Sequence, residues 1–370
     1  MAINLREFGK LFAAGIGSTL STFGACTATG PSARLDQAQP GIGPFDVERA
    51  RRDTPGITRV THLNTAGAAL PPRGVRDAIL DHVRLESEIG PYEAADAKAG
   101  LIKNTYQSLA RLLGCAPDEI ALSESGTRAW DMAFYAMRFN PGDRILTSAA
   151  EYGSNYIAYP QVAQRTGAVV EVLPERRARS GLAQRAPRGA ATRPGRPRGA
   201  HACTRGGRAR ESGRGGRQAA RLETRQRYMV EPTAQRFESW ERNIGAQIGL
   251  GVAVEYTLAW DIGAIRERVT ALSDRLRISL AELHGVAVHD LGRTRCGLVS
   301  FAMRGQEPAA VANALRARGI NVGALGRRST PLDMEDRGLD LVIRASVHYY
   351  NTDEEIDRLV DAVRDLAGRP

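Results

Sequence analysis

Lysine is almost absent from this chain of 370 residues, which holds only Lys10, Lys98 and Lys103. Cysteine is also scarce, and the four cysteines have neither metal-ligand spacing nor the spacing of a disulfide framework. They are Cys26, Cys115, Cys203 and Cys296. No run approaches the roughly 20 apolar residues that span a membrane. These absences exclude a cysteine-based metal site and a disulfide-stapled scaffold, and they predict a chain without a membrane span.

Acidic residues are almost missing from one central segment. Residues 176–225 hold fifteen arginines but only Glu211 and Glu223 as acids, so the rest of the chain is mildly acidic although the net charge is +10. Within it, "RAPRGAATRPGRPRGAHACTRGGRARESGRGGR" (185–217) has no aromatic residue and no aliphatic residue larger than alanine. Such a composition cannot offset the entropy of ordering, so we expect 176–226 to be disordered.

An arginine–glycine segment of this kind can also bind nucleic-acid phosphates. Segments with that function usually interleave aromatic residues that stack on bases, and this one has none. Binding of nucleic acid is therefore the less favoured interpretation of this segment. The favoured interpretation is that the segment has no binding function.

The first 43 residues read as a disordered or signal-like extension. "NLREFGKLFAAG" has a basic start and a weak apolar stretch, and Leu5 stands where a twin-arginine signal would have its first arginine. We expect a cytoplasmic protein, with export through this degenerate signal as the alternative.

From residue 44 onward, helical and strand patterns alternate, which is typical of an α/β fold with a parallel or mixed sheet covered by helices. Apolar spacing predicts helices over 72–87, 99–114 and 127–139, and later over 244–260 and 262–283. Strands are expected at 119–126, at 143–152 and, as a buried strand, at 169–173. The last part, with "VSFAMRG", "LVIRASV" and "EEIDRLVDAVRDLAG", predicts a smaller α+β unit.

Three motifs suggest binding chemistry, and each has a plain structural alternative. "SESGTRAWDMAF" places Ser125, Gly126, Thr127 and Arg128 at a helix start, which suits a phosphate but equally suits helix capping. In "AEYGSNY", Tyr152 follows a strand and could stack on a flat ring, or it is a half-exposed loop residue. In "RASVHYYNTDEEIDRL", Arg344 could grip a carboxylate, or it is a surface arginine beside a capping box in which Thr352 caps the helix and Glu355 stands three residues on.

Taken together, these motifs resemble the class V aminotransferase family, which are fold-type I enzymes that use pyridoxal phosphate (PLP) and include cysteine desulfurases and isopenicillin N epimerase-like proteins. "HLNTAGAALPP" resembles the opening loop of the family, "ESGTRA" its phosphate loop and "AEYGSN" its ring-stacking segment, with Tyr152 where many members have histidine. The resemblance covers about 44–174 and 227–370, and also includes "RFESWERNIGAQIGLG" and "RRSTPLDMEDRGLDLVIRASVHYYNT".

The resemblance implies a PLP-binding large domain over 44–257 and a C-terminal small domain over 258–370, with the central part of the large domain disrupted. It assigns cofactor binding to Ser125, Gly126, Thr127, Arg128 and Tyr152. It assigns substrate binding to Asn64, Ser329, Thr330 and Arg344, and it implies no metal. It further implies an amino-acid substrate, transamination, C–S lyase or epimerase chemistry, and a homodimer.

Two groups that PLP chemistry needs are missing. The family has a lysine that forms a Schiff base and an aspartate opposite the ring nitrogen, both between the ring-stacking segment and the small domain. Here no lysine follows Lys103, and no aspartate occurs between Asp143 and Asp261. We therefore expect no catalytic residue of that kind, no covalent PLP binding and a catalytically inactive chain.

A change of reading frame is our hypothesis for the origin of the arginine-rich segment. Back-translated and read one base later, residues 200–205 become compatible with L-T-H-V-P, and the codons up to Gly213 with x-x-G-G-L-V-N-P. The family has "THVP…GGLVNP" at this place. The hypothesis is out-of-frame translation of a GC-rich gene, joined to a deletion of the stretches with the aspartate and the lysine, which would make this copy a pseudoenzyme.

Overall fold

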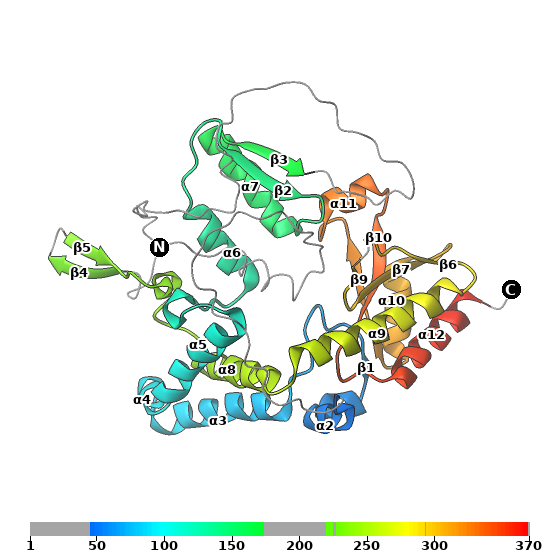
Figure 1. Cartoon of the computed structure of the whole chain (residues 1–370), viewed down its shortest axis with the longest axis horizontal. Helices are drawn as coiled ribbons and strands as arrows, with labels where there is room; N and C mark the ends of the chain where they lie inside the picture. Colours follow the sequence, from blue (N-terminus) through cyan, green and yellow to red (C-terminus); the bar gives the residue numbers. More distant parts are fainter. Residues whose placement is uncertain (1–44, 174–219, 225–226, 293, 369–370) are drawn as a thin grey trace, which may run out of the picture. The chain divides into compact units, whose positions relative to one another are not determined.

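The computed structural model describes residues 45–173, 220–224, 227–292 and 294–368 (Figure 1). The expected extension over 1–43 lies outside the described residues, and so does most of the arginine-rich segment. The chain forms two compact units that interleave along the sequence. Of the described residues, the first unit contains 78–173, 220–224, 227–251 and 325–341, and the second contains the rest. The expected division at residue 257 is not tested by this and stays a prediction.

The second unit is built on a four-stranded sheet in the order β6-β7-β10-β9. These strands are β6 (Val286–Val288), β7 (Leu298–Met303), β10 (Leu341–Ser346) and β9 (Gly323–Gly326), and β7 is antiparallel to both neighbours. Alternate residues of β7, namely Val299, Phe301 and Met303, are buried, as expected for a strand with one covered face. The covering helices are α9 (Ile262–Ala281), α10 (Pro308–Ala317) and α12 (Asp353–Ala367) (Figure 1).

The N-terminal residues of the second unit pack against its C-terminal part. They form α2 (Val47–Asp53), η1 (Pro55–Thr58) and β1 (Thr61–His62), and β1 pairs in parallel with β8 (Ile320–Asn321). A bridge between Asn64 and Ser346 continues this alignment to the end of β10. Residues far apart in the sequence therefore meet at the carboxyl end of β10.

Two helices of the first unit, α5 (Ala99–Leu113) and α8 (Ile244–Leu258), pack closely against each other. They belong to a group of four helices and two short turns. The other two helices are α3 (Arg73–Ile89) and α4 (Pro91–Ala97), and the turns are η2 (Pro117–Glu119) and η3 (Ala234–Phe237). Gly114 ends α5 in the left-handed conformation, as the sequence predicts. On α8, Gly251 lies so close to Thr105 of α5 that an added Cβ would overlap its hydroxyl.

A second layer of the first unit consists of strands and helices in alternation. They are α6 (Gly126–Tyr135), β2 (Arg144–Ser148), α7 (Gly153–Thr166) and β3 (Val169–Leu173), followed later by α11 (Pro331–Asp336). β2 and β3 form a two-stranded parallel sheet, and Phe134, Ile145 and Tyr159 form its buried core with Val162. β4 (Ala220–Thr224) pairs with β5 (Arg227–Val230) in an antiparallel hairpin.

Two strand expectations are wrong. Residues 120–124 form no strand, although Ile120 is buried, because only Ala121 and Leu122 separate Ile120 from the polar Ser-Glu-Ser-Gly turn. Val169–Leu173 is a strand but not a buried one, since Val169, Val172 and Leu173 are 54%, 39% and 45% exposed. Among the described strands β3 pairs only with β2, so no further strand covers it.

No single helix in the described ranges is both long and apolar enough to cross a membrane. α8 and α9 pass that test only when taken together, and they are bent by 84° at the break between them.

Candidate functional site

The first group of predicted site residues lies at the start of α6, in the first unit. Ser125 caps this helix, because its side chain accepts a hydrogen bond of 3.3 Å from Arg128 N. The Arg128 guanidinium is held at 3.1 Å from the Glu124 carboxylate. The capping interpretation is therefore correct. It does not compete with anion binding, because the remaining N–H groups of the first turn still point out of the helix.

The start of α7 adjoins the start of α6. The hydroxyls of Thr127 and Ser154 lie 3.4 Å apart, and Tyr152 is the N-cap residue of α7 with 40% of its surface exposed. Glu151 fixes this corner, since its carboxylate accepts hydrogen bonds from Tyr152 N at 2.9 Å and from Tyr159 OH at 2.7 Å. The exposed ring of Tyr152 is thus available to a planar ligand, although its backbone is held in place.

The segment before α11 reaches the same corner. Gly153 N donates a hydrogen bond of 2.8 Å to the Ser329 carbonyl, and Asp333 N donates one of 3.1 Å to the Ala149 carbonyl. A Cβ at position 153 would overlap the Arg328 carbonyl, so only glycine allows this approach. Thr330 is the N-cap residue of α11, and its side chain makes no capping bond. The first unit therefore brings together Ser125, Gly126, Thr127, Arg128, Tyr152, Ser329 and Thr330.

The remaining two predicted residues meet in the second unit. Arg344 donates from a terminal guanidinium nitrogen to Asn64 Oδ1 at 3.2 Å, and its Nε is buried without a hydrogen-bond partner. Burial lowers the pKa of this arginine, and no acidic side chain in the described part of the chain offsets that effect. A half-buried cation with an unused donor is suited to a carboxylate ligand, and it is not the surface arginine of the structural alternative.

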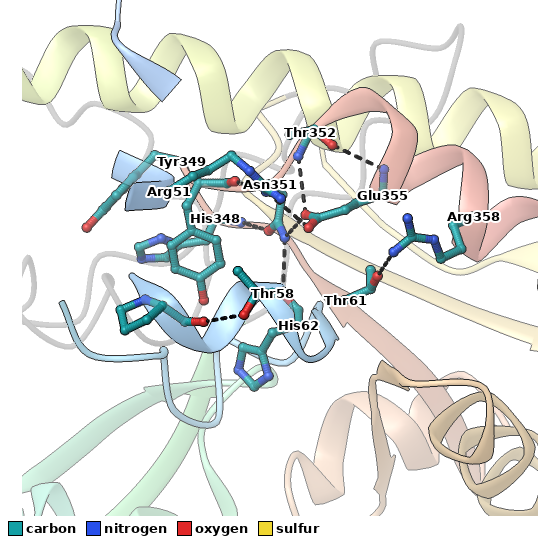
Figure 2. A network of polar contacts seen from close by, with 12 residues as sticks. Arg51, Thr58, Thr61, His62, His348, Tyr349, Asn351, Thr352, Glu355 and Arg358 are labelled. Carbon is teal, nitrogen blue, oxygen red and sulfur yellow. Dashed lines mark hydrogen bonds and ion pairs between the residues drawn. The ribbon is translucent and has the colours of Figure 1, made fainter. Parts of the chain in front are cut away.

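A polar network lies beside His62, two residues before Asn64, and Figure 2 shows its members. Arg51 donates to the Tyr350 carbonyl at 2.8 Å and to Glu355 at 3.0 Å. Asn351 donates to the His62 carbonyl at 3.2 Å and to Glu355 at 2.8 Å. The segment before Asn64 is therefore tied to the turn after β10.

His348 lies in this turn as a packing residue. Its ring packs on Tyr349 and Tyr350, with centroid distances of 4.0 and 4.3 Å, and its Nδ1 is buried without a partner. Burial, with a smaller effect from nearby His62, lowers the pKa of His348 to about 4. A neutral imidazole is the form that this environment favours near neutral pH.

The described lysines belong to neither group of site residues. Lys98 directly precedes α5, and Lys103 lies on that helix with its side chain exposed. Within the ranges that the structure describes, no group of three or more histidine, cysteine, aspartate or glutamate side chains could hold a metal ion.

Sequence reasoning missed two acidic residues that organise the first unit. Glu151 positions Tyr152, and Glu238 accepts a hydrogen bond of 2.8 Å from Leu122 N in the loop before α6. Glu151 lies in "AEYGSNY" and Glu238 in "RFESWERNIGAQIGLG". A single acidic residue in a polar stretch does not indicate which backbone N–H group will donate a hydrogen bond to it.

Comparison with known proteins identifies one family. The family model described as "Aminotransferase class-V" matches residues 62–185 and 204–359. A relative from Mycobacterium leprae, "Probable cysteine desulfurase 1", is 33% identical over 144 residues, which is 39% of this chain. That alignment spans only 23% of the relative's own length.

Solved structures have the same fold. The cysteine desulfurase CsdA from Escherichia coli superposes with a TM-score of 0.71 at 20% identity, covering 87% of this chain and 98% of that one. A mutant of C-DES with glycine covalently linked to its PLP cofactor gives a TM-score of 0.65 at 19% identity, covering 85% and 99%. At these identities the likeness concerns the fold alone.

Proposed function

Since the chain belongs to the class V aminotransferase family and has the fold-type I architecture, we propose that it is a cysteine desulfurase-like chain without covalent PLP chemistry. It retains the residues for the phosphate, for the ring face and for a substrate carboxylate. The observation that carries the proposal is that no lysine follows Lys103.

Two groups of residues, one in each unit, fit parts of the cofactor and of an amino-acid substrate. At the start of α6, Ser125 to Arg128 offer backbone N–H groups and hydroxyls for a phosphate, and Tyr152 offers a ring face from the start of α7. In the second unit, the unpartnered Nε of Arg344 offers a donor for a carboxylate, with Asn64 orienting the guanidinium.

The residues that would hold PLP covalently and at its ring nitrogen are missing. When bound, PLP acts as an electron sink for bonds at the α-carbon of an amino acid, and this requires a lysine amine and an acid at the ring nitrogen. Lys98 and Lys103 lie at the start of α5, and the chain has no aspartate between Asp143 and Asp261. Transamination, C–S cleavage and epimerisation are therefore activities of the family that this chain is proposed to have lost.

Reductive trapping tests this proposal. The purified chain is mixed with PLP and treated with borohydride, which fixes any imine between PLP and a lysine, and each lysine is then examined by mass spectrometry. We expect no stoichiometric adduct, because Lys98 and Lys103 should be labelled only as weakly as free surface lysines. The Lys98→Arg/Lys103→Arg variant is the control, and it should differ from the unaltered chain only by the loss of this weak labelling. One adduct per chain at a single lysine, together with turnover of an amino acid, would contradict the proposal.

A change of reading frame best explains why the lysine and the aspartate are missing. Codons back-translated from 200–213 and read one base later are compatible with the family's sequence, and the two missing groups belong between the same flanking segments. The chain is thus proposed to be a pseudoenzyme that arose from a frameshift and a deletion.

The remaining proposals follow the family. They are an amino acid as the ancestral substrate, a homodimer as the assembly and the cytoplasm as the location, with export as the alternative. Size-exclusion chromatography with light scattering tests the homodimer directly, because a mass of one chain would contradict it.

A further inference from the structure

A buried carboxylate lies behind the loop that leads into α6. Glu238 follows η3 and is 3% exposed. Its Oε1 accepts a hydrogen bond of 2.8 Å from Leu122 N, and the Tyr106 hydroxyl lies 2.9 Å from both of its oxygens. Arg242 donates to Oε2 and forms an ion pair with it. One side chain thus joins α5, the loop before α6 and the segment before α8.

The hydrogen bond from Leu122 N joins this loop to Glu238, a residue distant in the sequence. Among the described residues, 121–124 make no other hydrogen bond to any element outside the loop and α6. Leu122 is three residues before Ser125, which caps α6. The position of Leu122 N therefore fixes where the first turn of α6, with its N–H groups, begins.

The surroundings keep Glu238 as an acceptor. Gln247 on α8 donates to the Tyr106 oxygen at 2.8 Å, so the Tyr106 hydroxyl hydrogen is free to point at Glu238. Burial, and then the Glu238 charge, raise the pKa of Tyr106, which keeps it a donor. A buried carboxylate is costly unless it is paired and hydrogen-bonded, and Arg242, Tyr106 and Leu122 N satisfy it together.

We propose that Glu238 is the positioning residue for the phosphate-binding start of α6, acting through Leu122 N. The ligand part of this statement rests on the proposed function, in which that helix start binds a phosphate. Arg242 has a different role, because it balances the charge of Glu238.

Three variants separate positioning from stability. Glu238→Ala removes the acceptor, Glu238→Gln keeps an acceptor oxygen without the charge, and Arg242→Gln removes the ion pair while leaving the bond to Leu122 N. For each, hydrogen exchange of the Leu122 amide and the midpoint of urea unfolding are measured. Calorimetric titration with pyridoxine 5′-phosphate, which has no aldehyde to react with a lysine, reports on the phosphate site.

Glu238→Ala is expected to weaken ligand binding about tenfold and to speed exchange at Leu122 by about the same factor, which is the value of one hydrogen bond to a charged group. Glu238→Gln should restore both measurements to within about threefold of the unaltered chain. Arg242→Gln should lower the urea midpoint but leave exchange at Leu122 and ligand affinity almost unchanged.

Two results would overturn the positioning role. One is unchanged exchange at Leu122 in Glu238→Ala. The other is a loss of ligand affinity in Arg242→Gln as large as that in Glu238→Ala, which would mean that affinity follows stability alone. If the unaltered chain does not bind pyridoxine 5′-phosphate while exchange at Leu122 responds as expected, the proposed function fails and the positioning of the loop by Glu238 stands.

Discussion

Two ionisable side chains, Arg344 and His348, are buried without an acidic partner among the described residues. Arg344 and His348 lie four residues apart around the end of β10, and burial lowers the pKa of both. The consequences differ because an arginine stays charged, whereas a histidine near pKa 4 is neutral at pH 7. The arginine therefore suits an anionic ligand, and the histidine makes folding sensitive to acid.

The histidine gives a prediction about pH. The unfolded chain takes up a proton at His348 below about pH 6.5, but the folded chain does so only below about pH 4. The free energy of unfolding should therefore fall as the pH drops from 6.5 to 4, by about 3 kcal/mol at most. Urea unfolding of the unaltered chain and of His348→Phe at several pH values measures this. The difference between the two free energies of unfolding removes the contribution of the carboxylates, which both chains share. If the two curves of free energy against pH run parallel, the prediction is wrong.

Sequence reasoning located residues whose role is encoded locally and missed those whose role depends on distant contacts. Ser125 and Tyr152 follow from the order strand, turn and helix, and Thr352 from its capping box with Glu355. Glu238 was not found, because its partners Leu122 and Tyr106 are more than 100 positions away.

At the scale of elements, amphipathic helices were predicted best. The helices expected over 72–87 and 99–114 occur as Arg73–Ile89 and Ala99–Leu113, since periodic apolar spacing is a property of the segment itself. Burial of strands was predicted less well. An apolar run such as Val169–Leu173 indicates a strand, but whether it is covered depends on which strands lie beside it.

Helix α12 gives a ranked stability prediction. Thr352 and Glu355 form its capping box, and Glu355 also accepts hydrogen bonds from Asn351 and Arg51. Thr352→Ala should lower the free energy of unfolding by about 1 kcal/mol, and Glu355→Ala by about 3 kcal/mol because Arg51 loses its buried partner.

The matched control for these variants is Asp361→Asn on the same helix. Asp361 forms an exposed pair with Arg364, so its loss should cost less than about 0.5 kcal/mol. Chemical unfolding of the three variants checks the order. A Glu355→Ala variant as stable as Asp361→Asn would contradict the role of the network shown in Figure 2.

At the scale of the whole molecule, the family and the fold-type I architecture were predictable, but the short strands that join distant parts of the chain were not. The pairing of β1 with β8 joins residues more than 250 positions apart, and two-residue strands leave no pattern in the sequence. The residues proposed to bind phosphate, ring and carboxylate are present, whereas the lysine and the aspartate between the flanking segments are missing.

The sequence of the source DNA across codons 170–240 tests this account most directly. The account predicts that one inserted or deleted base, together with missing codons, separates this reading from a frame that encodes "THVP…GGLVNP", an aspartate and a lysine. If the DNA encodes the arginine-rich segment as it stands, with no such frame and no lost codons, the frameshift account is contradicted. Selection or gradual decay would then have to explain the segment.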